Sequence, residues 1–318
     1  MRPAGAGARG RRAGGIPPVN AGTAKALLVS LRPRQWTKNL LLFAGLVFSQ
    51  SAAELPSIVR ATLGCLVFCL LSGAVYLFND CVDAPHDRRH PLKRHRPIAA
   101  GRLPVAVAKR WALGLALAAL AASWLLGVGF GATASAFVVL NLGYSLGLKR
   151  FVILDVVGIA VSFVLRAVAS VEVLRPVQGA VPLSPWLILC TFLLALFLGF
   201  AKRRAEFVQE ESANHAARPS LRHYGRRLLD VLVLSSFAST LMAYVLYTLA
   251  DGTVAQFGTT RLVFTAPFVA AGLGRYLVLV FKDDRGSRPH EILLTDPAIQ
   301  VAVLGWITCV CLIIGLHR

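Results

Sequence analysis

The chain has 318 residues, of which 56% are hydrophobic and only 15% charged, and its mean hydropathy is +0.64. Because soluble domains usually contain about 25% charged residues, this composition excludes a soluble protein and indicates an integral membrane protein. Lys and Arg outnumber Asp and Glu by 34 to 15. Nucleic-acid binding would explain a basic patch, but not in a chain with so many apolar residues. The charge therefore indicates membrane topology and, in part, an anionic phosphate substrate.

Residues 1–22 are mostly Gly, Ala, Arg and Pro, which predicts a disordered basic tail without the apolar core of a secretory signal. The rest of the chain, 23–318, is predicted to be one transmembrane domain, because no linker interrupts its apolar segments. The predicted fold class is all-α, a polytopic membrane protein with about nine transmembrane helices. The nine segments are 39–53, 57–78, 110–127, 130–146, 152–171, 185–200, 229–250, 261–281 and 297–316.

The distribution of charge predicts the topology. With the N-terminus in the cytoplasm, the loops on the cytoplasmic side hold most of the Lys and Arg residues, as the positive-inside rule requires. The opposite side holds Arg60, Arg175, Arg261 and Arg318. The long polar loops then all lie on the cytoplasmic face of the inner (plasma) membrane, where the chemistry is expected as well.

Three acids follow the second apolar segment. Asp80, Asp83 and Asp87 are spaced three and four residues apart, which places them on one face of a helix. Three carboxylates on one face repel one another unless a cation lies between them, and Mg²⁺ is held by one or two carboxylates together with substrate phosphates. A solvated acidic helix end is the alternative. The chain is poor in acids, however, and ionisable residues at membrane depth are functional candidates.

A basic stretch at 88–101 follows directly and includes Lys93 and Arg96. Cations are expected beside a Mg²⁺–diphosphate, because the metal neutralises some phosphate oxygens and Arg or Lys binds the others. Loop charge from the positive-inside rule alone is the competing explanation. The histidines of this region are interpreted as hydrogen-bonding loop residues, since Mg²⁺ prefers oxygen ligands.

A second polar group lies on the same predicted side and contains Tyr144, Lys149 and Asp155. An acid at this helix end would clamp a diphosphate from the side opposite the first three acids. Arg166 follows eleven residues later, three turns along the same helical face. A buried Arg needs an anionic or carbonyl partner, so Arg166 either contacts a phosphate or ties helices together, and the second role is slightly favoured.

Further candidates border two other segments. Lys38 and Asn39 lie at the start of the first segment. Lys202 and Arg203 follow the sixth. The sequence contains no P-loop, zinc motif or G-x-S-x-G nucleophile elbow. The chemistry is therefore expected to come from carboxylates, a metal and a diphosphate.

These motifs resemble those of the UbiA prenyltransferase superfamily of membrane enzymes. The run N-D-x-x-D-x-x-x-D at 79–87 resembles the first signature of that superfamily. The continuation D-R-x-H-P-x-K-x-x-R-P-I-A-A-G at 87–101 is most similar to decaprenyl-phosphate phosphoribosyltransferases. So are R-P-x-Q-W-x-K-N at 32–39 and Y-S-x-x-L-K-x-x-x-x-x-D at 144–155.

The resemblance implies nine transmembrane helices around a central cavity open to lipid. It implies Mg²⁺-dependent transfer of 5-phosphoribose from phosphoribosyl diphosphate to a polyprenyl phosphate of the decaprenyl type, for synthesis of cell-envelope glycolipid precursors. Asp80, Asp83 and Asp87 would be catalytic metal ligands, and Asp155 a fourth catalytic acid. The implied substrate contacts are Lys38, Asn79, Lys93, Arg96, Tyr144, Lys149, Arg166, Lys202 and Arg203.

The second motif departs from part of the superfamily, because Asp155 is followed by Val156, Val157, Gly158 and Ile159. Aromatic prenyltransferases of the superfamily carry two spaced aspartates there, so the single acid weakens the alternative of a prenyl diphosphate donor with a 4-hydroxybenzoate-type acceptor. A transporter or lipid-binding protein is the third hypothesis, and no matched pair of broken helices favours it. The oligomeric state stays open, and a homo-oligomer is compatible with the sequence.

Overall fold

The computed structural model describes residues 21–91, 93–179, 182–213, 224–282, 291–292 and 295–315. All regular elements in these ranges are helices, which confirms the all-α fold class. The tail predicted at 1–22 lies outside the described residues, apart from its last two, which begin helix α1 (Ala21–Ser30).

Eight helices of the described part are long and apolar enough to cross a bilayer, and they coincide with eight of the nine predicted segments. They are α3 (Leu55–Asp87), α4 (Val105–Leu126), α5 (Val128–Leu146), α6 (Leu154–Glu172), α8 (Pro185–Ala213), α9 (Arg226–Leu249), α11 (Ala266–Lys282) and α13 (Pro297–Gly315). Short elements between them are η2 (Lys93–His95), η3 (Leu148–Arg150), α7 (Arg175–Gln178), α10 (Asp251–Phe257) and η5 (Arg261–Thr265).

The first predicted segment, 39–53, differs from a continuous transmembrane α-helix. A 3₁₀ helix, η1 (Pro33–Phe43), leads into the short α-helix α2 (Ala44–Phe48). Since a 3₁₀ helix rises about 2.0 Å per residue and an α-helix about 1.5 Å, the two together extend about 30 Å. That length matches the hydrocarbon thickness of a bilayer, although this unit is not among the eight long helices.

Gly45 explains how α2 packs against α6. A Cβ atom at Gly45 would lie 2.0 Å from the carbonyl oxygen of Ser170. We expect Gly45→Ala to lower the free energy of unfolding by about 1 to 3 kcal/mol, because the overpacked backbones must separate. Gly114→Ala on α4 is the matched control, since nothing lies within 4 Å of that Cβ. Thermal midpoints in detergent measure both, and equal midpoints would contradict the close-approach argument.

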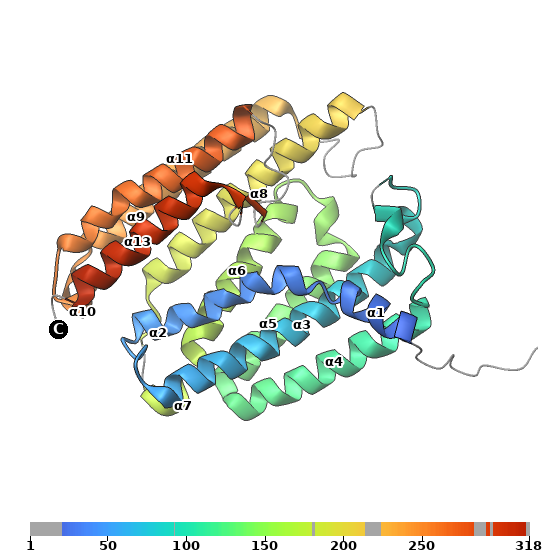
Figure 1. The fold of residues 1–318 in the computed structure, drawn as a ribbon, viewed down its shortest axis with the longest axis horizontal. Helices are drawn as coiled ribbons and strands as arrows, with labels where there is room; N and C mark the ends of the chain where they lie inside the picture. The colour runs from blue at the N-terminus through green and yellow to red at the C-terminus, as the bar shows by residue number, and fades with distance from the viewer. Residues whose placement is uncertain are drawn as a thin grey trace, which may run out of the picture.

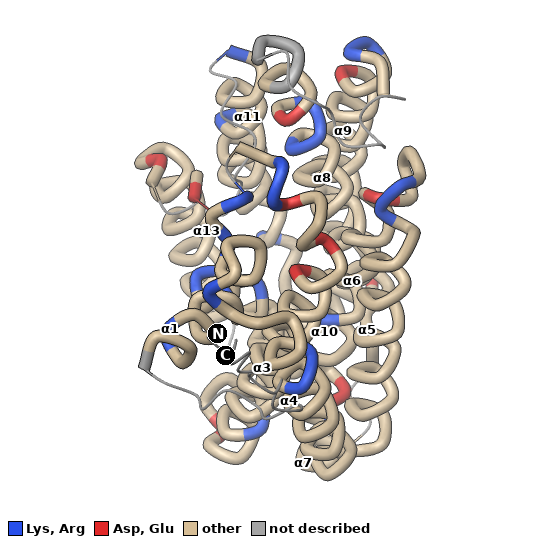
Figure 2. Tube along the Cα trace, turned by 90° about the vertical axis from the view of Figure 1, so that its right-hand side faces the viewer, with Lys and Arg blue, Asp and Glu red and all other residues tan. Residues whose placement is uncertain are grey.

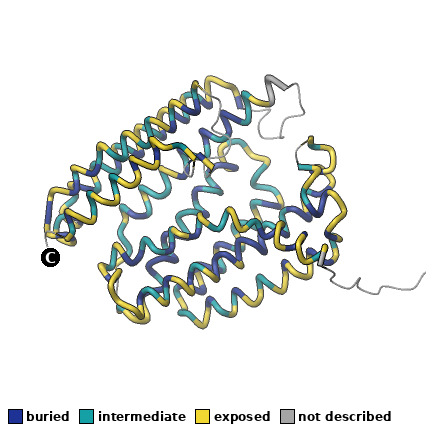
Figure 3. The backbone as a smooth tube through the Cα atoms, viewed as in Figure 1, coloured by how far each residue is buried: buried dark blue, intermediate teal, exposed yellow. Residues whose placement is uncertain are grey.

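Helix α3 is the most buried of the long helices. Inside its apolar window 67% of the residues are buried, against 17% for α13. Figure 1 shows α3 among α4, α5 and α6, while α9, α11 and α13 form a layer on the other side of α8. The ring of Phe68 on α3 packs against Phe130 and Phe137 of α5, with centroids 5.6 and 5.1 Å apart. Figure 3 shows the buried residues following α3 and the exposed ones on the outer helices.

The outer helices expose apolar side chains. Leu125 and Val128 are 88% and 73% exposed, and Val139, Val301 and Leu304 are exposed as well. Large continuous apolar surfaces are unusual on soluble proteins but suit contact with lipid tails. The chain is therefore a multi-pass membrane protein.

Charged residues gather where α3 ends, and we call this region, which includes Asp87, η2 and η3, the polar end. Figure 2 faces this side of the molecule and shows Lys and Arg in blue with Asp and Glu in red among them. The polar end brings together the segments that the sequence analysis singled out at 79–101 and 144–155.

Candidate active site

Asp80 and Asp87 lie in the last turns of α3 and share one arginine. Arg96 Nη1 lies 3.1 Å from Asp80 Oδ1 and 2.7 Å from Asp87 Oδ2. Arg32 Nη2 contacts the same oxygen of Asp80 at 2.5 Å. Both acids are buried, so these charge-assisted contacts compensate for the loss of water around the carboxylates.

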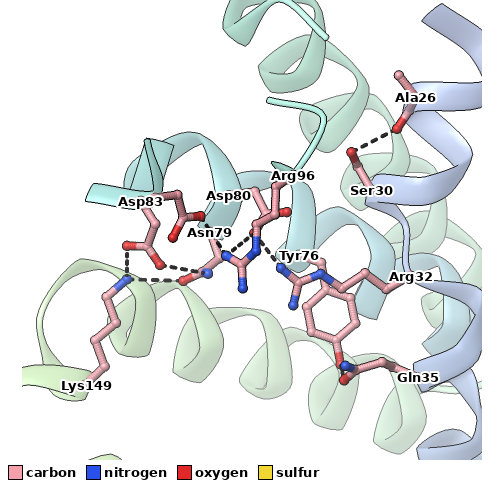
Figure 4. A network of polar contacts seen from close by, with 11 residues as sticks. Ala26, Ser30, Arg32, Gln35, Tyr76, Asn79, Asp80, Asp83, Arg96 and Lys149 are labelled. Carbon is pink, nitrogen blue, oxygen red and sulfur yellow. Dashed lines mark hydrogen bonds and ion pairs between the residues drawn. The ribbon is translucent and has the colours of Figure 1, made fainter. Parts of the chain in front are cut away.

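Asp83 makes a separate ion pair on the neighbouring side of the helix. Lys149 Nζ on η3 lies 2.5 Å from Asp83 Oδ1 and donates to Asn79 Oδ1 at 3.2 Å. The amide of Asn79 also donates to Asp83 Oδ2 at 3.1 Å. Figure 4 shows Lys149 approaching from one side and the arginines from the other.

The spacing of Asp80, Asp83 and Asp87 predicted three carboxylates on one face of a helix, but they do not all meet at one point. Asp80 and Asp87 converge on Arg96, whereas Asp83 turns to Lys149. Among the described residues, no group of three or more His, Cys, Asp or Glu side chains is arranged to hold a metal ion. Basic side chains occupy the carboxylate oxygens instead, and the metal-ligand role of these acids stays a prediction. We refer to Asp80, Asp83 and Asp87 as the acidic cluster.

The backbone of Arg32 has the left-handed conformation, with φ of 55°, directly before Pro33 and the start of η1. A non-glycine residue in this region is uncommon and costs free energy, so the surrounding structure must hold it. This turn carries the guanidinium to Asp80 and places it 5.0 Å over the ring of Tyr76.

Asp155 belongs to a second ion-pair network at the start of α6. Its Oδ2 accepts from Arg203 Nε at 2.6 Å, and its Oδ1 accepts from Tyr224 Oη at 2.8 Å. Asp155 and Arg203 are 0% and 1% exposed. Arg203 Nη1 also contacts Glu206 Oε2 at 2.5 Å. Both oxygens of Asp155 thus have partners outside the acidic cluster, and its role as a catalytic acid stays a prediction.

Tyr224 also accepts a hydrogen bond from the backbone N–H of Ile153, at 2.6 Å. Ile153 has a φ of 67°, and it precedes α6. The pKa of Tyr224 is raised, mainly because burial disfavours the phenolate and also because the hydroxyl donates to Asp155. The hydroxyl therefore stays protonated and locks the turn that leads into Asp155.

Arg166 lies inside the helix bundle and is 4% exposed. Its Nε donates to Asn39 Oδ1 at 2.9 Å, its Nη1 to the carbonyl and hydroxyl of Ser162 at 2.9 Å, and its Nη2 to Ser72 Oγ at 3.3 Å. The guanidinium also lies 4.6 Å from the centroid of the Phe137 ring. These contacts join η1, α3, α5 and α6, and they support the helix-tying role.

Lys38 on η1 donates to Gln35 Oε1 at 2.8 Å, and this oxygen also accepts from Tyr76 Oη at 3.4 Å. The guanidinium groups of Arg166 and Arg32 act on Lys38 with like charge. Lys38 thus lies among other cations rather than beside a carboxylate.

The remaining candidates lie on α8, η2 and α5. Lys202 pairs with Glu206 at 3.7 Å on α8. Lys93 is half-buried on η2, three residues before Arg96. Tyr144 packs on α6, because a Cβ at Gly158 would lie 3.2 Å from its ring.

Arg32 and Tyr224, which contact Asp80 and Asp155, were absent from the predicted site. Arg32 is the first residue of the motif at 32–39, so the motif could have indicated Arg32 as a site residue. Tyr224 is buried and bonded to Asp155. The local sequence of Tyr224 carries no signal for that contact, which depends on the packing of α6 against α8 and α9.

The family model of the UbiA prenyltransferase family matches residues 40–293. A decaprenyl-phosphate phosphoribosyltransferase of Corynebacterium glutamicum is 32% identical over 92% of this chain and 87% of its own length. The enzyme of the same name from Mycolicibacterium smegmatis is 33% identical over 92% of each chain. A UbiA homologue from Archaeoglobus fulgidus has a similar fold, with a TM-score of 0.67 and 19% identity over 91% of this chain and 99% of that one. The chain therefore belongs to the UbiA prenyltransferase family.

Proposed function

We propose that this protein transfers 5-phosphoribose from phosphoribosyl diphosphate to a polyprenyl phosphate and releases diphosphate. The observation that carries the proposal is the acidic cluster ringed by Arg32, Arg96 and Lys149 at the end of an otherwise apolar helix. The curated relatives with this activity in their names, at 32% and 33% identity over 92% of the chain, support the same reaction. The outcome is a membrane glycosyltransferase that supplies cell-envelope glycolipid precursors.

A divalent cation fits the acidic cluster chemically. Its members offer hard carboxylate oxygens, the ligands that Mg²⁺ prefers. Their present partners Arg32 and Arg96 are 23% and 28% exposed on long side chains, so these cations can move from carboxylate to substrate phosphate. A solved UbiA homologue from Archaeoglobus fulgidus is described as bound to DMAPP and Mg²⁺. Bound there, Mg²⁺ would neutralise part of the charge on the leaving diphosphate.

The residues of the site supply mainly position and charge. Arg32, Arg96 and Lys149 exchange carboxylate for diphosphate oxygens when the donor binds, and their charges then stabilise the departing diphosphate. The acceptor is already an anionic phosphate, so the reaction needs no strong general base. Asn79 holds Lys149 and Asp83 together on the opposite side of the site.

The proposal also covers the orientation of the protein in the membrane, its domain organisation and its assembly. The acidic cluster lies on the cytoplasmic side of the inner membrane, because the basic loops gather with it. Residues 23–318 form one UbiA-like domain behind a basic tail. The apolar interior of the bundle takes the polyprenyl chain, and the protein can assemble as a homo-oligomer.

A paired donor assay tests the function. Purified protein should transfer label from phosphoribosyl diphosphate to decaprenyl phosphate, and the transfer should stop when EDTA removes Mg²⁺ and return when Mg²⁺ is added. The same preparation should not prenylate 4-hydroxybenzoate from a prenyl diphosphate. The reverse pattern would establish the aromatic prenyltransferase alternative, and no turnover of either donor would count against both.

A further inference from the structure

A row of polar side chains continues from the acidic cluster into the apolar interior, and we call this row the path. On α3, Tyr76 and Ser72 precede Asp80 by one and two turns, so they lie about 6 and 12 Å deeper at 1.5 Å per residue. Tyr76 Oη donates to Gln35 at 3.4 Å, and Ser72 Oγ donates to Asn39 at 3.5 Å. These polar side chains therefore lie between η1 and α3. Figure 4 shows the upper part of the path, from Asp80 past Tyr76 to Gln35.

The balance of charge changes along this path. At the acidic cluster three carboxylates face Arg32, Arg96 and Lys149. Deeper, Lys38 and Arg166 donate to amide, hydroxyl and carbonyl oxygens, all of them neutral. Buried charge without an opposite charge is costly, and ionisable residues inside a membrane protein mark substrate paths. The deep part of the path therefore carries a net positive charge that an anion would compensate.

Helix tying explains Arg166 but leaves Lys38 unexplained. Arg166 joins three elements through neutral acceptors, and its charge could serve that role alone. Lys38 bonds a single glutamine on its own helix, which an uncharged donor could do as well. Arg166 and Arg32 lie near Lys38, and both cations repel its charge. A bound anion would relieve that repulsion.

We propose that Lys38, supported by Arg166, holds the phosphate of the lipid acceptor, while Arg32, Arg96 and Lys149 hold the donor diphosphate. This assignment rests on the proposed function. A polyprenyl phosphate reaches the site from the apolar interior, so its phosphate meets the deep cations first. Tyr76 and Ser72 lie about 6 and 12 Å deeper along α3 than Asp80, and the ribose would lie between the two anions.

The geometry suits a direct displacement. An oxygen of the acceptor phosphate forms a bond to C1 of the ribose while the bond from C1 to the diphosphate oxygen breaks. The electron pair of that bond leaves with the diphosphate toward the acidic cluster. No proton moves, because the attacking phosphate is already ionised at neutral pH. Two anion sites on opposite sides of C1 provide the alignment that such a step requires.

Variants at Lys38 separate the two anion sites. We expect Lys38→Gln to raise the KM for decaprenyl phosphate roughly tenfold or more, the cost of one contact to a charged group, with the KM for phosphoribosyl diphosphate little changed. Lys38→Arg should restore most of the affinity. Arg110→Gln is the matched control, because it removes one exposed cation from the start of α4 at the polar end. A Lys38→Gln variant that raises only the donor KM would overturn the assignment.

Binding of decaprenyl phosphate without donor gives a second readout, independent of turnover. Wild type and Lys38→Arg should bind this lipid with similar affinity, since arginine keeps the charge, whereas Lys38→Gln should bind it roughly tenfold or more weakly.

Native mass spectrometry in detergent measures that binding directly, with uncharged decaprenol as the reference lipid. Preference of the wild type for the phosphate, lost in Lys38→Gln, would support the assignment. Equal retention of both lipids by wild type and variant would overturn it, even if the wild type turns over normally. If the wild type binds decaprenyl phosphate through Lys38 but transfers no phosphoribose, the proposed function fails and the anion site stands.

Discussion

Replacing Asp83 with Asn is expected to lower kcat/KM by about 10²- to 10³-fold. Asp83 carries the negative charge opposite Lys149 and is 22% exposed, the most accessible carboxylate of the acidic cluster. Asn preserves the size of the side chain but cannot neutralise a cation. The loss should therefore appear in Mg²⁺-dependent release of diphosphate from phosphoribosyl diphosphate, measured with saturating decaprenyl phosphate.

Asp251→Asn provides the control for this substitution. Asp251 is exposed at the start of α10, at the other end of the helices from the polar end, so its replacement should leave the rate unchanged. Thermal midpoints should be similar for both variants and the wild type. Full activity in a folded Asp83→Asn protein would rule out a role for this carboxylate in handling the diphosphate.

Replacing Asp155 with Leu is expected to lower the free energy of unfolding by about 3 to 5 kcal/mol. The change removes the 2.6 Å contact from Arg203, which is 1% exposed, and the acceptor of the Tyr224 hydroxyl. A buried guanidinium then loses one of its two carboxylate partners. Unfolding in mixed detergent micelles measures the loss.

A double variant shows whether the buried charge is the cause. Asp155→Leu combined with Arg203→Met should be more stable than Asp155→Leu alone, because apolar pairs often replace buried ion pairs at little cost. Asp230→Leu should cost less, since Asp230 is 32% exposed beside Arg204. If the double variant were as unstable as the single one, the loss would come from packing rather than from unpaired charge.

The sequence predicted the positions of the long helices well because hydrophobic length is a strong local signal. Eight of the nine segments became long helices. The exception, 39–53, is a 3₁₀ helix followed by a short α-helix. Hydropathy does not distinguish these helix types, since it counts apolar residues and not the hydrogen-bond partner of each N–H.

The candidate site was predictable in its members but not in its pairing. The spacing of Asp80, Asp83 and Asp87 placed them together at the end of α3. Which cation each acid meets depends on how η1, η2 and η3 fold back over that end, and so Arg32 and Arg96 meet Asp80 while Lys149 meets Asp83.

Composition and hydropathy alone determined that this protein is a multi-pass membrane protein, because burial of apolar residues in lipid depends on their number and order along the chain. The motifs at 79–101 and 144–155 indicated an anion-binding chemistry. Only the tertiary structure paired Asp155 with Arg203 and Tyr224, and only it brought Arg166 on α6 to Asn39 on η1 and Ser72 on α3. Those decisions rest on contacts between residues far apart in the chain, whose energies no local pattern encodes.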